Sequence, residues 1–310
     1  MFSLISGGCL PINRPAIGGP AGPVKPFRDD EPPMADNGEG DPRALRELRN
    51  RIDAIDAEMH RLLIERGSVI DSLIRTKVTG RPGAAFRPAR EAEMMRRLVA
   101  RHAGALPLAT VEHIWREIIS TFTRMQAPFD VVIDLSVDPE KMRDLARFVF
   151  GFSVTVTGAR DPAAVVAAVA GANDLGLIAR AAKGAWWRKL GGPDAPRIMA
   201  YLPFIRADER PADLPAFVVS PPLSDPTTPD IAAFAVTADD PFEAVLGVEV
   251  LASEGNDLLL AAPGTLSEEE LPRYLKDHGV VVKSVASVGG FARGVALGGL
   301  WSVLYARVSP

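Results

Sequence analysis

One long helical pattern, from Asp41 to about Thr79, constrains the fold of this chain more than any other feature. Its apolar side chains recur in steps of three and four residues, which places them on one face of an α-helix. These side chains are Leu45, Leu48, Ile52, Ile55, Met59, Leu62, Val69 and Leu73. The pattern predicts a long amphipathic helix whose apolar face must be covered.

Two cations interrupt this apolar face. Arg66 takes the position between Leu62 and Val69 where a hydrophobe is expected, and Lys77 lies on nearly the same face. A cation on a buried face needs an anionic partner. Arg66 and Lys77 are roughly 16 to 17 Å apart along a helix, so their long side chains can converge on one small anion.

Arg49 cannot reach that anion from its own chain. It precedes Arg66 by 17 residues, which is roughly 25 Å along a straight helix and a rotation of about 100°. If Arg49 belongs to the same site, it comes from a partner copy. The alternative interpretation makes Arg49 a solvated surface residue and Lys77 a cation that the helix C-terminus favours.

Two shorter helices follow the long one. Asp41 and Pro42 suit the start of the first helix, and the breakers of residues 80–83 suit its end. The second helix is predicted from near Ala89 towards Gly104, and the third runs from Pro107 to Gln126. An apolar stripe marks the third helix: Val111, Ile114, Trp115, Ile118, Ile119 and Phe122. Two short helices cannot cover the long one, so a partner copy is expected to do so.

Several separately spaced motifs between Asp41 and Gln126 follow one pattern. They are residues 48–56, 62–66, Lys77, residues 88–91, and Ile118-Ile119 with Gln126. Together they resemble the signature of the all-helical class of chorismate mutase. The resemblance implies a three-helix all-α domain over residues 41–127, a helix-exchanged homodimer with shared sites, and the rearrangement of chorismate to prephenate in phenylalanine and tyrosine biosynthesis.

The implied reaction needs binding and electrostatics alone. Chorismate is a dicarboxylate with an enolpyruvyl ether, and its unimolecular rearrangement requires no nucleophile, metal or cofactor. The enzyme holds a reactive conformer and stabilises negative charge on the ether oxygen. Guanidinium groups match carboxylate geometry, which suits Arg66 and the other subunit's copy of Arg49 to substrate binding.

The remaining implied catalytic residues are hydrogen-bonding groups. Lys77 and Gln126 are expected to donate to the ether oxygen, and Glu91 is expected to accept from the ring hydroxyl, with Arg90 beside it. Taken singly, Glu91 also suits a helix N-terminus. Two positions depart from the family pattern: Arg87 replaces an acidic residue, and Phe122 replaces a small hydroxyl residue and is expected to be core.

The chain beyond Gln126 changes to alternating strands and helices, which predicts an α/β domain over residues 128–310 with parallel pairing. Strands are expected at 129–135, 152–157, 174–179 and 197–205, and helices at 139–150 and 162–170. In order and spacing this half resembles a degenerate prephenate dehydratase domain. Residues 257–310 are expected to form a strand that begins at Asp257, a helix at 267–278 and strands at 280–285 and 301–308, and they weakly resemble an ACT regulatory module.

The dehydratase motifs themselves are missing. The Gly-Thr-Phe turn is replaced by residues 135–137, the Glu-Asn-Ser motif by residues 180–182, and the Thr-Arg-Phe motif has no match near residues 217–219. Dehydration chemistry is therefore not assigned. A basic, aromatic patch at residues 183–189 suits an anion or aromatic ligand, but packing at a domain edge is the favoured interpretation.

Composition limits the other function classes. A net charge of −4 over 310 residues argues against a nucleic-acid or membrane-surface protein. The single cysteine, Cys9, excludes a disulfide framework and fits a cytoplasmic protein. His60, His102 and His113 lack metal-ligand spacing, so no metal site is predicted. Residues 1–40 are rich in Pro and Gly and are expected to be a disordered extension, with Met34 as an alternative start.

Chorismate mutase is the resulting functional hypothesis, with no cofactor. Three alternatives stay open: a pyruvate lyase acting on isochorismate with the same helical fold, a bifunctional chorismate mutase/prephenate dehydratase, and a non-catalytic regulatory protein that senses an aromatic amino acid.

Overall fold

The structure is a computed structural model that describes residues 41–76, 86–170, 172, 174–207, 210–223 and 227–297. It divides into two compact units, one ending at Arg61 and the other beginning at Leu62. The expected disordered extension of residues 1–40, Lys77 and the strand expected at 301–308 lie outside the described residues.

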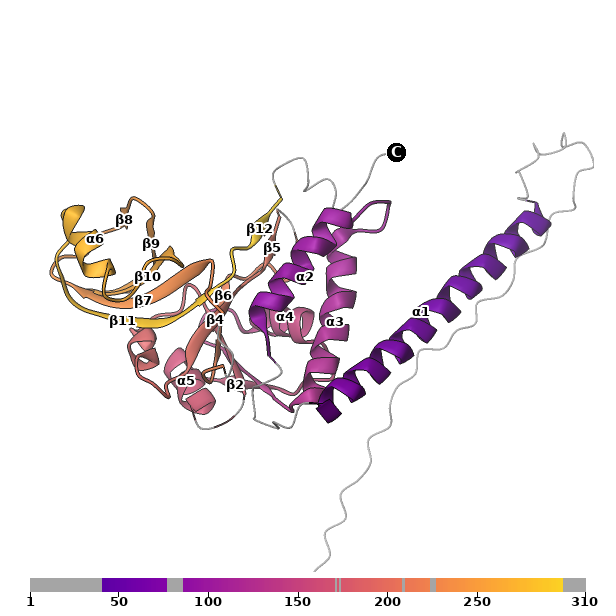
Figure 1. Cartoon of the computed structure of the whole chain (residues 1–310), viewed down its shortest axis with the longest axis horizontal. Coiled ribbons are helices and arrows are strands. Elements are labelled where there is room, and N and C mark those ends of the chain that lie inside the picture. The colour runs from indigo at the N-terminus through magenta and orange to yellow at the C-terminus, as the bar shows by residue number, and fades with distance from the viewer. Residues whose placement is uncertain are drawn as a thin grey trace, which may run out of the picture. The chain divides into compact units, whose positions relative to one another are not determined.

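The long helix is present as α1, Pro42–Thr76 (Figure 1). The Asp41 carboxylate caps it by accepting a hydrogen bond of 2.9 Å from the Arg43 backbone N–H. None of its 35 residues is buried. The apolar side chains at 45, 48, 52, 55, 59, 62 and 69 are between 45% and 60% exposed. The apolar face that the sequence predicts is therefore uncovered in the single chain.

The next two helices, α2 (Pro88–Arg101) and α3 (Leu108–Gln126), match the sequence prediction closely. The apolar stripe of α3 marks the helix correctly but is not its buried face, since Ile114 is 38% exposed. The buried residues of α3 are Leu108, Ala109, Glu112, Arg116, Ser120 and Thr123. A largely polar face of α3 is thus the one that packs inside the chain.

This polar face is buried because α4 (Pro139–Phe150) offers it hydrogen-bond partners. The Ser120 hydroxyl donates to the carbonyl oxygen of Phe150 at 2.6 Å. The His113 ring stacks on Phe148 at 5.0 Å, and its Nδ1 lies 3.2 Å from the Phe148 carbonyl oxygen. These α4 contacts leave His113 partly buried on its face of α3.

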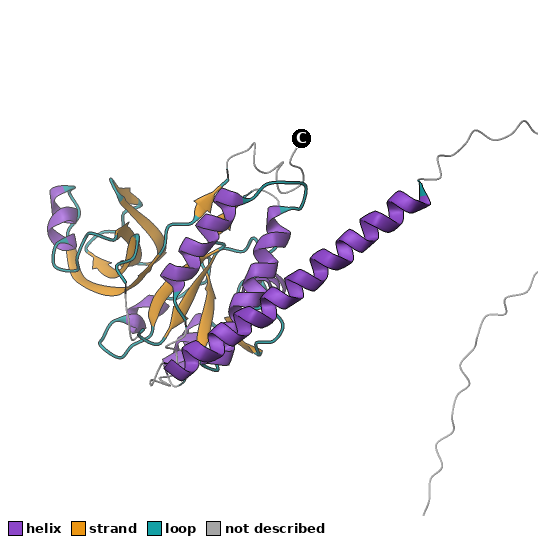
Figure 2. Cartoon of the chain, turned by 45° about the vertical axis from the view of Figure 1, so that its right-hand side comes forward, coloured by secondary structure: helices purple, strands orange, loops and turns teal. Residues whose placement is uncertain are grey.

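The second half is an α/β domain around one sheet of ten strands, in the order β2-β1-β3-β6-β4-β11-β7-β10-β9-β8 (Figure 2). The strands are β1 (Val131–Asp134), β2 (Val156–Ala159), β3 (Leu175–Ala179), β4 (Arg197–Leu202), β6 (Ala216–Ser220), β7 (Ile231–Ala238), β8 (Ala244–Val245), β9 (Val248–Glu254), β10 (Asp257–Pro263) and β11 (Val282–Phe291). A second sheet pairs β5 (Ile205–Arg206) with β12 (Val295–Ala296). The helices are α5 (Pro162–Ala170), α6 (Leu271–Asp277) and the 3₁₀ helix η1 (Trp186–Leu190).

Parallel pairing is only part of this topology. It joins β1 to β2 and β3, and it joins β4 to β11. The other pairs in the large sheet are antiparallel. The predicted strands coincide with β1 and β3, and the strand expected at 280–285 overlaps the start of β11. The strand expected at 152–157 overlaps β2 only at Val156 and Thr157, and the strand expected at 197–205 ends at Leu202, before Pro203. No strand was predicted at β6, β7, β8 or β9.

The basic, aromatic patch proves to be structural. Trp186 and Trp187 are buried in the main core, with their rings 5.7 Å apart, while Lys183, Arg188 and Lys189 are exposed. This outcome agrees with the favoured interpretation of packing.

The helical segment also packs on the second half through apolar contacts. Met95, Leu98 and Leu108 form one buried cluster with Phe204 and Ile205. α2 and the start of α3 therefore share a small core with Phe204 and β5.

The start of α4 provides a test of local stability. The Asp138 carboxylate accepts a hydrogen bond of 3.0 Å from the Lys141 backbone N–H. Replacing Asp138 by Ala is expected to lower the free energy of unfolding by about 1 kcal/mol, measured by chemical denaturation. Asp144→Ala, at an exposed position inside the same helix, is the control and should cost less than about 0.5 kcal/mol. Equal losses in the two variants would contradict a capping role.

Candidate active site

Arg66 lies half-buried on α1 against the ring of Phe122 on α3. The guanidinium carbon is 4.4 Å from the centre of that ring. Its Nη1 is buried and has no hydrogen-bond partner among the described residues. Phe122 was expected to be a core residue, but it is only partly buried because its ring supports Arg66. The site thus contains a positioned guanidinium donor that is not satisfied.

Arg90, in the first turn of α2, adds a second positive charge. Burial, and then the positive charge of Arg90, lower the pKa of Arg66 below its ordinary value. Arg90 itself is exposed and forms no ion pair with a described residue. Two cations that raise each other's electrostatic energy form a site that an anion stabilises.

Gln126 lies at the end of the same helix as Phe122. Its Nε2 donates a hydrogen bond of 3.0 Å to the backbone carbonyl oxygen of Phe122. Arg66 and Gln126 therefore both contact Phe122, one through the ring and the other through the backbone. The predicted donor Gln126 is held in place one helical turn beyond the ring that supports Arg66.

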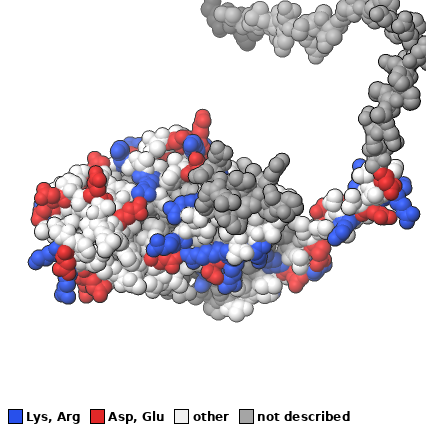
Figure 3. All heavy atoms as spheres, turned by 90° about the horizontal axis from the view of Figure 1, so that it is seen from above, with Lys and Arg blue, Asp and Glu red and all other residues white. Residues whose placement is uncertain are grey.

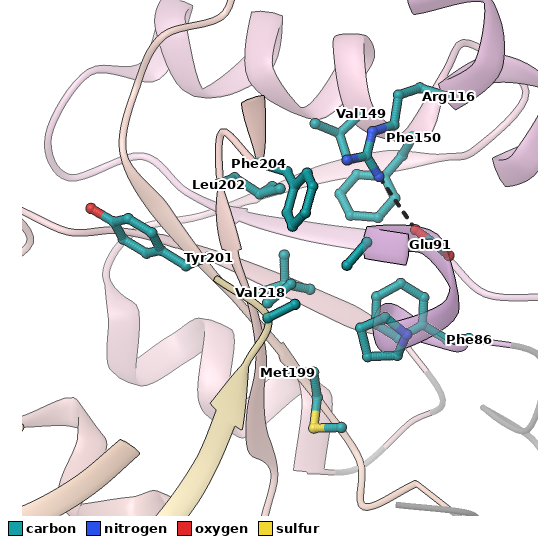
Figure 4. A pocket seen from close by; sticks show the side chains of 14 residues that line it. Phe86, Glu91, Arg116, Val149, Phe150, Met199, Tyr201, Leu202, Phe204 and Val218 are labelled. Carbon is teal, nitrogen blue, oxygen red and sulfur yellow. Dashed lines mark hydrogen bonds and ion pairs between the residues drawn. The ribbon is translucent and has the colours of Figure 1, made fainter. Parts of the chain in front are cut away.

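Glu91 is directed to a different neighbour. Its Oε2 lies 3.4 Å from Nη1 of Arg116, and the two side chains are 19% and 6% exposed (Figure 4). Burial raises the pKa of Glu91, and the positive charge of Arg116 lowers it to a smaller degree. No hydrogen bond or ion pair in the described part of the chain joins Glu91 to Arg66, Arg90 or Gln126.

A cavity beside this ion pair is too small for a dicarboxylate substrate. Its volume is about 30 Å³, and its wall combines the pair with apolar side chains such as Phe86, Phe150 and Phe204 (Figure 4). A space of this size holds one or two water molecules. Neither Arg66 nor Arg90 lines this cavity.

Arg49 and Lys77 are the other two predicted residues. Arg49 is exposed on α1, in the unit that ends at Arg61. Lys77 lies outside the described residues. The structure therefore places Arg66 and Gln126 in contact with Phe122, with the charge of Arg90 acting on Arg66, and it pairs Glu91 with Arg116.

Sequence reasoning missed four buried charged residues in the described part of the chain: Glu112, Arg116, Asp134 and Arg210. A usable signal was present on α3, where Glu112, Arg116 and Ser120 recur every four residues and so share one face. This face reads as solvent-exposed by ordinary rules, since charged residues are seldom buried unless paired. Arg210 lies 98 residues from Glu112 in sequence, so no local sequence pattern predicts their contact.

The described residues lack both a metal-binding cluster and a membrane-spanning helix. The described residues contain no cluster of His, Cys, Asp or Glu that could hold a metal ion. No helix in the described part is long and apolar enough to cross a membrane. On the face shown in Figure 3, acidic and basic side chains are interspersed.

Comparisons with known proteins concern the helical segment. Residues 48–127 match the family model of chorismate mutase type II. Over 83 residues the chain is 37% identical to a protein of Neisseria gonorrhoeae named bifunctional chorismate mutase/prephenate dehydratase. This match covers 27% of the chain and 22% of the relative. No solved structure matches the chain.

Proposed function

We propose that this protein is a chorismate mutase, an isomerase that converts chorismate to prephenate in aromatic amino acid biosynthesis in the cytoplasm. One observation carries the proposal: the Nη1 of Arg66 is buried next to the charge of Arg90 and has no hydrogen-bond partner among the described residues. It lies within the segment that matches the chorismate mutase type II family. A carboxylate of the substrate is the anion that satisfies this donor.

The remaining groups suit the chemistry of the rearrangement. Gln126 and Lys77 donate to the ether oxygen as negative charge develops there. A donor of this kind is worth on the order of 3 kcal/mol in a dry site. Glu91 accepts from the ring hydroxyl through Oε1, because Oε2 faces Arg116. The reaction is intramolecular and uses no cofactor.

The proposed active form is a helix-exchanged homodimer. The uncovered apolar face of α1 supports it, since side chains that are about half exposed in one chain are suited to cover the same face of another. In this arrangement the three helices of one chain and α1 of the other form each site. Arg49 then binds the second carboxylate of the substrate held by Arg66 of the other chain.

The α/β half, residues 128–310, is assigned no chemistry of its own. The name of the Neisseria relative favours a second candidate, a bifunctional chorismate mutase/prephenate dehydratase. Against it, Arg180, Ala181 and Ala182 stand where the dehydratase motif is expected, and Arg180 is bound to Glu249 at 2.8 Å. The weak likeness of residues 257–310 to an ACT module stays a prediction from the sequence.

Product analysis of the purified full chain tests these functions. With chorismate as the sole substrate, we expect prephenate to form without added metal or cofactor, and we expect no phenylpyruvate from prephenate. Incubation with isochorismate separates a mutase from a pyruvate lyase, which releases pyruvate. Failure to consume chorismate would rule out the proposed activity, and phenylpyruvate formation would establish the bifunctional alternative.

A further inference from the structure

A chain of buried charges runs from the helical domain into the α/β half. Oε2 of Glu91 lies 3.4 Å from Nη1 of Arg116, and Nε of Arg116 lies 3.9 Å from Oε1 of Glu112. Oε2 of Glu112 then accepts a hydrogen bond of 3.0 Å from Nη2 of Arg210. Arg210 also donates to the carbonyl oxygen of Ile205 at 2.6 Å. The charges of Arg210 and Glu112 are both 2% exposed, so solvent screens them little.

The contacts along this chain are unequal in quality. The Glu112–Arg210 bond is short, whereas both contacts of Arg116 are long. Nε of Arg116 has no hydrogen-bond partner among the described residues, although the atom is buried. Arg116 is therefore shared between Glu91 and Glu112, and its position depends on how well Arg210 satisfies Glu112.

We infer that Arg116 is a positioning residue for Glu91, and that Arg210 of the α/β half controls it by holding Glu112. This inference rests on the proposed function, because it concerns a residue of the proposed mutase site. The α/β half would then influence catalysis, because its Arg210 affects the position and the charge of Glu91. In physical terms, Arg210 neutralises Glu112, and Arg116 is thereby left to keep the Glu91 carboxylate ionised and oriented.

The charges around Glu91 give the direction of the effect. Arg116 faces it from α3, and Tyr201 lies across the cavity on β4. Glu112 lies on the other side of Arg116. The charges of Arg210 and His113 lower the pKa of Glu112, and they affect Glu91 only through it. Burial raises the pKa of Glu112, and Arg210 lowers it more than Arg116 does. Without Arg210, Glu112 is expected to attract Arg116 more strongly. Arg116 then interacts less with Glu91, and the pKa of Glu91 rises.

The pH dependence of kcat/KM for chorismate tests the inference in the full-length protein. Ionised Glu91 accepts the hydrogen bond, so activity is lost as pH falls through its pKa. Arg116→Gln is expected to move this acid limb to higher pH by about one unit or more. Arg210→Gln should move the acid limb in the same direction by a smaller amount. Arg116→Lys keeps the positive charge and should leave the acid limb close to its wild-type position. Arg97→Gln, which removes an exposed cation of α2 paired with Glu93, is the matched control and should leave the limb in place.

A second measurement does not depend on turnover. The Glu91 carboxyl group can be titrated by NMR in the substrate-free protein, with its signal assigned from Glu91→Gln. The pKa of Glu91 should rise in Arg210→Gln. If a folded Arg210→Gln protein keeps the wild-type pKa and the wild-type acid limb, the inference is wrong. If the wild-type protein does not turn over chorismate, the proposed function fails, and the NMR titration alone still decides whether Arg210 controls Glu91.

A double variant covers the case in which Arg210→Gln does not fold. Glu112→Gln with Arg210→Gln removes one negative and one positive charge and leaves two amides that can hydrogen-bond each other. Arg116 then has Glu91 as its remaining acidic partner in the chain of charges. The acid limb and the pKa of Glu91 should both move below their wild-type positions, and unchanged values in the double variant would overturn the inference.

Discussion

Replacing Arg66 by Ala is expected to lower kcat/KM for chorismate on the order of a thousandfold, because it leaves a substrate carboxylate unpaired in a desolvated site. Nη1 of Arg66 forms no hydrogen bond to a described residue, so little internal structure depends on it. The thermal midpoint should therefore change by only a few degrees, on the order of the shift from a 1 kcal/mol change. Steady-state kinetics with a parallel thermal scan measure both quantities.

Arg75→Ala is the matched control for this variant. Arg75 is an exposed cation on the same helix, and its Nη2 lies 3.0 Å from the Ser72 hydroxyl. The control should keep kcat/KM within about threefold of wild type, since exposed charges away from a site contribute little. A similar loss of activity in both variants would show that general positive charge on α1, rather than a carboxylate contact at Arg66, is required.

Mixing inactive chains is expected to restore activity. If each site takes Arg66 from one chain and Arg49 from the other, a dimer of an Arg49→Ala chain with an Arg66→Ala chain contains one intact site and one doubly damaged site. Random pairing of equal amounts should recover about a quarter of the wild-type activity, because about half of the dimers are mixed and each has one working site. The measurement is prephenate formation after subunit exchange, with mixed dimers counted by native mass spectrometry.

The control for mixing is an Arg66→Ala chain combined with a chain that carries both Arg49→Ala and Arg66→Ala. No pairing of these two chains contains Arg66, so no activity should return. If the first mixture forms mixed dimers and stays inactive, the shared site is wrong, even for a protein that proves to be a mutase.

The helical domain was largely predictable from the sequence. The step of three and four residues along α1, the capping residue Asp41 and the breaker at Pro107 are local signals, and the helices lie where these signals place them. Arg66 was identifiable because it interrupts an apolar face. Its contact with Phe122 was not, since an aromatic residue on an apolar stripe reads as core until the neighbouring cation is known.

The second half was predictable in part. Its first three strands alternate along the chain with helices, and β4, the start of β10 and α6 also lie where the sequence places them. The later strands pair mostly antiparallel and over long separations, as β7 does with β11, so no local period identifies their partners. The buried face of α3 was not predictable for a related reason. Glu112 is buried because it pairs with Arg210, and the sequence of α3 contains no local signal for a partner that lies 98 residues away.

A helix without a buried residue has a thermodynamic consequence in the proposed dimer. Isolated helices are marginal in water, and most of their stability comes from the packing of an apolar face. In the proposed dimer the apolar face of α1 packs against another molecule, so folding of this segment and association of two chains would be one linked equilibrium. The order of the first helix, and of each site that contains its Arg49, then depends on protein concentration, whereas the sheet of the second half is stabilised within one chain.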